Sequence, residues 1–176
     1  MEFMNKKAIS TPSWQWVLLI ILFLAFSRLI PHPPNFTPLG AMALIAGANF
    51  KDLKIALIMP ISAMLVSDVL LGFHSSMIYV YSAVAVIVLG SYWLIKQSSA
   101  LSMTMGAVIS AIVFFVITNF GAWLSHDMYA HTFTGLQQAY IAAIPFFKNT
   151  LISNLLFTAV GFYALRQLPE RHVANS

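Results

Sequence analysis

Long apolar runs separated by short polar joints divide the chain into six predicted helices. The runs extend over Trp14 to Ile30, Leu39 to Phe50, Ile55 to Leu71, Met77 to Ile95, Ser102 to Leu124 and Asn149 to Leu168. An apolar helix of roughly 20 residues can cross the hydrocarbon core of a bilayer. We therefore predict an all-α integral membrane bundle of six transmembrane helices over residues 14–168, with tails at 1–13 and 169–176.

Three stretches depart from this simple pattern. Four prolines lie between Pro31 and Pro38, and because proline lacks an N–H and restrains the residue before it, we predict a rigid, extended loop there. The second run is short and rich in Gly and Ala, which predicts close packing inside the bundle or docking to another protein. Near the other end we predict a long loop from Ser125 to Gln138, then a partial helix from Tyr140 to Phe147 that Pro145 breaks.

The composition excludes a soluble domain. The chain is 60% hydrophobic and 8% charged, against about 25% charged residues in soluble proteins. Its net charge of +4 comes from cations scattered at the joints, so no dense basic stripe predicts nucleic-acid binding. The absence of cysteine excludes disulfides and thiolate chemistry. The first run lacks a small-residue cleavage site before Arg28, so we expect it to remain as a span.

The cations predict the orientation of the bundle. Those at alternate ends of the predicted spans are Lys6, Lys7, Lys51, Lys54, Lys96, Arg166 and Arg171. The positive-inside bias places this set in the cytoplasm, so we expect a bacterial inner membrane protein with both termini cytoplasmic. Four histidines map to the opposite side, namely His32, His74, His126 and His131. This polar, histidine-bearing outer surface is a candidate for the capture of a ligand.

One acidic residue and the outer polar groups are the candidates for binding. A carboxylate at membrane depth is costly without a partner, so Asp68 predicts either a structural pair with Arg28 or direct contact with a substrate. Apolar and aromatic walls with a few polar groups are typical of small-molecule pockets. The predicted lining residues are His32, Asn35, Asp68, His74, Tyr81, Asn119, Trp123, His126 and Tyr140. The histidine spacing matches no zinc signature, and we identify no catalytic set.

Four segments of the chain carry a resemblance to a known class of membrane protein. They are Arg28-Leu-Ile-Pro-His-Pro-Pro-Asn-Phe-Thr-Pro-Leu-Gly-Ala41, Asp68-Val-Leu-Leu-Gly-Phe-His74, Asn119-Phe-Gly-Ala-Trp-Leu124 and Ala143-Ile-Pro-Phe-Phe-Lys-Asn-Thr150. Together they resemble the substrate-binding S components of energy-coupling factor (ECF) vitamin transporters. The resemblance implies a six-helix subunit with an outward pocket covered by the outer loops.

Within that class the chain is most similar to the solitary cobalamin transporters, which work without a dedicated energising module. Those proteins ligate cobalt with a cysteine that this chain lacks, so His32 or His74 would have to contact the cobalt, or no protein ligand would. ECF complexes use small-residue patches on the first helices to bind a coupling subunit. Here the first run lacks that pattern, whereas the second has it at Ala43 and Gly47. Docking to a coupling module therefore stays open.

The sequence thus predicts a transport protein that binds a vitamin or related small metabolite outside and moves it into the cytoplasm, with cobalamin as the leading candidate. It would need no cofactor and would contact the substrate and membrane lipid. Two other classes remain as alternatives: a membrane enzyme with a histidine-bound metal at the outer face, and a non-catalytic subunit of a membrane assembly.

Overall fold

The computed structural model describes residues 14–95 and 99–167, and these residues form helices and connecting loops without any strand. The helices are α1 (Trp14–Ser27), α2 (Leu39–Asn49), α3 (Leu53–Leu71), α4 (Met77–Leu94), α5 (Ala100–Ser125) and α6 (Phe133–Gln167). The predicted all-helical bundle with six helices is therefore confirmed. The predicted tails at 1–13 and 169–176 lie outside the described residues.

Four of the helices account for the membrane character of the chain. Helices α3, α4, α5 and α6 are each long and apolar enough to cross a membrane. Helices α1 and α2 have 14 and 11 residues, which correspond to about 21 and about 17 Å of helix. The chain is thus a membrane protein in which two short helices pack among four longer ones.

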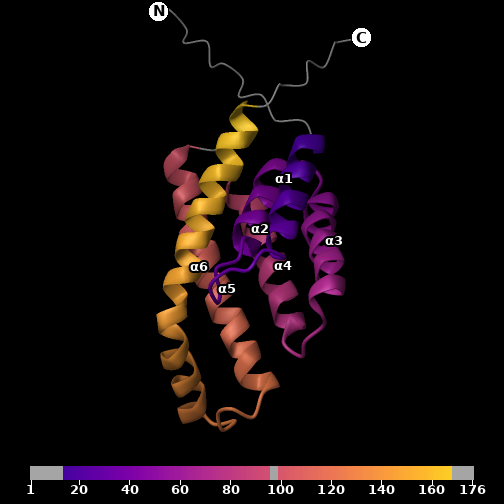
Figure 1. Cartoon of the computed structure of the whole chain (residues 1–176). Coiled ribbons are helices and arrows are strands. Elements are labelled where there is room, and N and C mark those ends of the chain that lie inside the picture. Colours follow the sequence, from indigo (N-terminus) through magenta and orange to yellow (C-terminus); the bar gives the residue numbers. More distant parts are fainter. Residues whose placement is uncertain (1–13, 96–98, 168–176) are drawn as a thin grey trace, which may run out of the picture.

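Helix α2 occupies the centre of the bundle. It contacts each of the other five helices, and all nine residues from Leu39 to Gly47 are buried (Figure 1). A methyl group on Gly47 would lie 2.7 Å from Cβ of Ser91 on α4, so the two helices approach closely because this position has no side chain. The small residues of α2 therefore serve packing inside the bundle, which was one of the two predicted uses.

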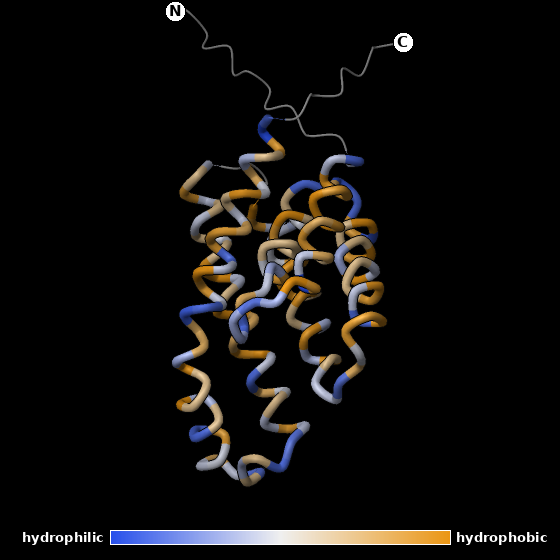
Figure 2. The backbone as a smooth tube through the Cα atoms, in the orientation of Figure 1, coloured by the Kyte–Doolittle hydropathy of each residue, from blue (hydrophilic) through white to orange (hydrophobic). Residues whose placement is uncertain are grey.

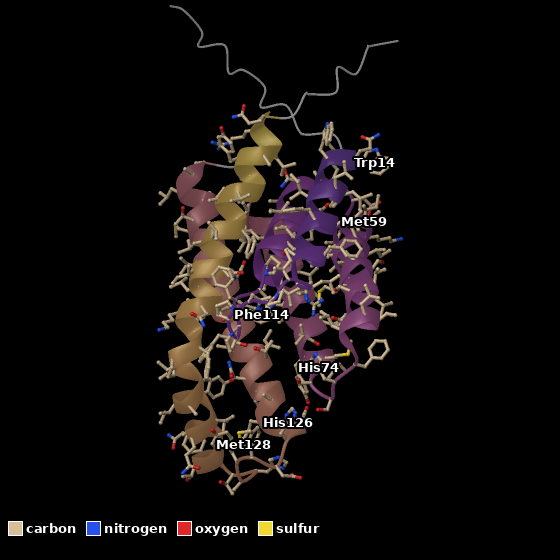
Figure 3. All side chains as sticks on the ribbon, in the orientation of Figure 1. Trp14, Met59, His74, Phe114, His126 and Met128 are labelled. Atoms are coloured by element: carbon tan, nitrogen blue, oxygen red, sulfur yellow. The ribbon has the colours of Figure 1, made fainter. Side chains whose placement is uncertain are left out.

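Helix α1 begins, and α6 ends, at the same end of the bundle, which we name the terminal end (Figure 1). The joint before α3 carries Lys51 and Lys54, and Arg166 lies in the last turn of α6. Trp14 lies at this end, whereas His74, His126 and Met128 lie at the far end (Figure 3). Lys51, Lys54 and Arg166 are thus separated from His74 and His126 in the way that the sequence predicted, whereas His32 belongs to the proline-rich loop and does not lie at the far end.

The proline-rich loop of residues 28–38 lies about halfway along the bundle and not at its far end (Figure 1). The side-chain amide of Asn149 donates to the carbonyl oxygen of Pro34 at 2.9 Å, and the Thr150 hydroxyl donates to the carbonyl of Asn35 at 3.4 Å. Asn149 lies 16 residues after Phe133, the first residue of α6, which is about 24 Å along a helix. The loop is therefore recessed well below the far end of α6. Figure 2 shows it as a polar segment at the middle of a largely apolar bundle.

The prediction of a long loop from Ser125 to Gln138 and a helix broken at Pro145 is wrong. Helix α6 runs without a break through Pro145, and only residues 126–132 connect it to α5. A proline removes one N–H from the helical ladder, a loss that long membrane helices with packed neighbours tolerate. The start of α6 is fixed by Thr132, whose hydroxyl accepts from the N–H of Gly135 at 3.2 Å.

Candidate functional site

A buried polar cluster joins three helices beside the recessed loop. Nη2 of Arg28 lies 2.7 Å from Oδ1 of Asp68, and the hydroxyl of Tyr81 donates to Oδ2 of Asp68 at 2.7 Å. Nη1 of Arg28 also donates to Oγ of Ser67 at 2.6 Å. Asp68 is 2% exposed. Both carboxylate oxygens have partners inside the protein, so the structural pair, one of the two predicted alternatives, is the one that forms.

The positions of these residues explain why the cluster forms. Arg28 follows the end of α1, Asp68 lies in the last turn of α3 and Tyr81 lies in the second turn of α4. The Arg28 side chain is 11% exposed, and a buried cation is stable only when it is paired and hydrogen-bonded. The cluster therefore fixes the start of the loop against α3 and α4. Asp68 and Tyr81 position Arg28.

We expect Tyr81→Phe to destabilise the protein by about 1.5–3 kcal/mol, because a hydrogen bond to a charged group is lost and one Asp68 oxygen is left buried. Tyr79→Phe is the matched control, since Tyr79 packs by its ring against Phe120 on α5. Thermal unfolding in detergent measures both changes. Equal effects of the two substitutions would show that the Tyr81 hydroxyl does not stabilise the carboxylate.

The recessed loop presents two of the predicted lining residues. His32 and Asn35 are both exposed. Nδ1 of His32 lies 3.0 Å from the carbonyl oxygen of Pro33, and Asn35 has a φ of 61°, a left-handed conformation that asparagine adopts more readily than most residues. Irregular backbone at membrane depth is tolerated only where protein covers it or where it lines a water-filled cavity. If the loop lies at membrane depth, its exposed side must therefore face water and not lipid.

His74 and His126 both lie toward the far end of the bundle (Figure 3). His74 lies in the turn between α3 and α4, where its Nδ1 is 3.0 Å from Oγ of Ser76. Oγ of Ser75 in the same turn is 3.4 Å from Nε2 of His126, the residue after α5. Both histidines are exposed. No contact among the described residues brings either of them next to His32.

Trp123 and Asn119 make their polar contacts locally. Nε1 of Trp123 donates to the carbonyl of Ala130 at 3.0 Å, and the Trp123 carbonyl lies 3.1 Å from Nε2 of His131. The side-chain amide of Asn119 donates to the carbonyl of Phe115 one turn earlier, at 2.7 Å. These contacts close the α5–α6 hairpin and fix its shape. The Trp123 ring also packs against the rings of Phe120 and His131, with centroids 5.6 and 5.4 Å apart.

Tyr140 lies in the outer half of α6 and faces α5. Its hydroxyl donates to the carbonyl of Val116 at 2.6 Å, and its ring packs edge-on against Phe115 with centroids 5.8 Å apart. It also lines an open hollow of about 500 Å³ together with Phe133, Leu136, Gln137 and Ile141. Among the nine predicted residues, Tyr140 is thus placed in a concave surface of largely apolar character.

Two further grooves lie toward the terminal end and contain none of the predicted residues. One, of about 280 Å³, lies between α4 and α5, and the other, of about 190 Å³, lies between α5 and α6. The nine predicted residues fall into four separate groups. Asp68 and Tyr81 belong to the buried cluster, His32 and Asn35 to the recessed loop, His74 and His126 to the far end, and Asn119, Trp123 and Tyr140 to the α5–α6 hairpin. Residues 14–95 and 99–167 contain no group of three or more His, Cys, Asp or Glu side chains that could hold a metal ion.

Two polar side chains of α6, Asn149 and Asn154, contact the recessed loop or the helix that follows it, and neither was among the predicted residues. Asn149 holds the recessed loop, and Asn154 lies buried against the first turn of α2. Each of these two residues is a polar residue within an apolar run of the sequence, which is also how Asp68 was identified. The pattern is weaker evidence for an asparagine, because an uncharged amide is less costly in a membrane than a carboxylate.

The comparisons with known proteins give a family and no nearer relative. No curated protein and no solved structure matches the chain. A family model described as a family of unknown function, DUF6580, matches residues 9–175. Because this match covers nearly the whole sequence, including every residue of the candidate site, the chain belongs to the DUF6580 family.

Proposed function

We propose that this protein is an uptake protein of the S-component type. It binds a vitamin or related small metabolite in a depression that opens at the far end of the bundle, and it releases the solute toward the terminal end. The observation that carries the proposal is the recessed position of the loop at residues 28–38, about 24 Å along α6 from the far end of that helix.

The physical argument is the solvation of the loop backbone. His32 and Asn35 are exposed, yet α6 continues past them with exposed apolar side chains such as Ile141 and Ile144. Loop carbonyls that faced hydrocarbon would lack hydrogen-bond partners, so water must reach them. A small solute that enters such a depression would be shielded from lipid.

The composition of the depression suits a solute with both polar and apolar parts. His32 and Asn35 contribute neutral donors and acceptors at the floor, and the buried Arg28 lies at one end of the same loop. Trp123 and Tyr140 contribute ring surfaces from the hairpin. A few polar groups among apolar walls are the usual composition of a small-molecule site. Cobalamin is the first candidate ligand, and a neutral His32 or His74 is able to ligate a metal carried by that ligand.

The test is native mass spectrometry, with an absorption spectrum, of protein gently extracted from its own membranes. We expect a retained small molecule in the wild type and a loss of at least tenfold in its occupancy in the double variant His32→Ala/Asn35→Gly. Glycine at position 35 keeps the left-handed φ without strain. A corrin spectrum would identify cobalamin.

Asn49→Ala is the matched control, because Asn49 ends α2 and bonds only to the carbonyl of Ile45 on its own helix. It should retain the solute at the wild-type level. A wild-type protein without any solute that instead holds stoichiometric metal, or a second polypeptide, would contradict the proposal and favour the membrane enzyme or the assembly subunit.

A further inference from the structure

The first turn of α2 has backbone donors without acceptors. The earliest N–H of this helix with an acceptor is that of Met42, which donates to the carbonyl of Pro38 at 2.8 Å. Pro38 precedes the helix and makes no side-chain cap. Within the described part of the chain, the N–H groups of Leu39, Gly40 and Ala41 therefore have no acceptor, as expected for the first turn of an uncapped helix. All three residues are buried.

A side-chain donor lies against the same turn. Asn154 of α6 is 1% exposed, and its Nδ2 is buried without a hydrogen-bond partner among the described residues. A methyl group on Gly40 would lie 2.6 Å from Oδ1 and 2.8 Å from Cγ of Asn154, so the amide packs directly on the helix start. Four donors, three from α2 and one from α6, thus share one buried location next to the recessed loop.

Such a group of donors calls for an oxygen acceptor from outside the fold. Buried donors without partners destabilise a protein, and native structures rarely keep several of them together. A helix N-terminus also carries a partial positive charge that favours anions. In membrane transporters, short helices direct such N-termini at the anionic group of the solute. The start of α2 has this geometry. It points away from the terminal end and directly follows the loop at residues 28–38, which forms the floor of the proposed depression.

We propose that the first turn of α2 and Asn154 bind a carboxylate group of the transported solute, an inference that rests on the proposed function. Cobalamin carries amides and a phosphodiester but no carboxylate, so this inference points to a carboxylated metabolite in place of cobalamin. A carboxylate has two oxygens, and four donors supply two hydrogen bonds to each of them. The loop at residues 28–38 leads directly into this turn and is fastened to α6 by the bonds from Asn149 and Thr150. Because Leu39, Gly40 and Ala41 are buried, the carboxylate reaches their N–H groups only when a neighbouring segment moves, and we expect this loop to be that segment.

The experiment uses acetate as the carboxylate probe and thermal unfolding of the full chain in detergent as the readout. Acetate should raise the Tm of the wild type relative to chloride at the same ionic strength. Asn154→Leu should raise the Tm without acetate, because the buried unpaired amide is gone, and should abolish the response to acetate. Ser153→Ala is the control: Ser153 is equally buried on α6 but its hydroxyl donates to the carbonyl of Thr150 at 3.0 Å. It should keep the acetate response.

Asn154→Asp gives an independent check should the leucine variant fold poorly. It replaces the amide donor by a second oxygen and a negative charge against the α2 start, so it should remove the acetate response by competition. A wild type that acetate does not stabilise, or an undiminished response in both Asn154 variants, would overturn the assignment.

Native mass spectrometry separates this site from the function on which it rests. A solute retained equally by wild type and Asn154→Leu would leave the uptake function standing and remove the carboxylate site. If the wild type retains no solute but responds to acetate, and Asn154→Leu loses that response, the carboxylate site stands and the uptake function does not.

Discussion

Replacing Asp68 with alanine is expected to destabilise the protein by about 3–5 kcal/mol, the cost of removing one partner from a buried ion pair. Arg28 would keep its charge with only 11% of its side chain exposed. The Tyr81 hydroxyl would lose its acceptor as well. Thermal or denaturant unfolding in detergent measures the loss, which should appear as a lower Tm and a lower yield of folded protein.

The double variant Arg28→Met/Asp68→Leu is the control for this prediction. It removes both charges and fills similar volume, and replacing a buried pair by apolar residues is often neutral or stabilising. The double variant should therefore be closer to the wild type than Asp68→Ala is. If it is instead as unstable as Asp68→Ala, the cluster stabilises the bundle by more than mutual neutralisation of its charges.

Gly47→Ala is expected to destabilise the bundle by about 1–3 kcal/mol, because an added methylene group overpacks a close helix contact. The new Cβ would lie 2.7 Å from Cβ of Ser91 and would also meet the backbone carbonyl of Val88 on α4. Backbone atoms cannot rotate away from such a contact as a side chain can. The whole helix α2 would have to shift, and with it the floor of the depression.

Gly90→Ala on α4 is the matched control, since a methyl group there would meet nothing within 4 Å. Alanine is a better helix former than glycine, so this change should stabilise the protein by about 0.5–1 kcal/mol. The two alanine variants should therefore shift the Tm in opposite directions. Similar shifts for both would show that α2 does not depend on a close approach to α4 at Gly47.

The features that were predicted correctly from the sequence share one property: each follows from the large free-energy cost of placing polar or charged groups in a membrane. The apolar runs predicted six helices because a membrane admits few other structures. A lone carboxylate at the end of such a run predicted either a pairing of Asp68 with Arg28 or contact with a substrate, because an unpaired charge there is too costly, and the pair is what forms. The separation of Lys51, Lys54 and Arg166 from His74 and His126 also followed from the joints alone, whereas the position of His32 did not.

Other features were not predictable because they depend on contacts between distant segments. Pro145 was expected to break a helix, yet α6 runs through it, as packed membrane helices tolerate. The prolines of the first segment predicted a loop correctly, but nothing local indicated its depth. That depth depends on Asn149 and Thr150, which follow Pro34 and Asn35 by 115 residues.

The sequence by itself therefore determined the helical membrane fold and the need of its buried acid for a partner, since each follows from the cost of placing a group in hydrocarbon. Only the tertiary structure decided where the proline-rich loop lies, how far α6 extends beyond it and that Asn154 faces the uncapped start of α2. The reason is physical: helix existence depends on solvation along one segment, whereas depth and juxtaposition depend on how six segments pack against each other.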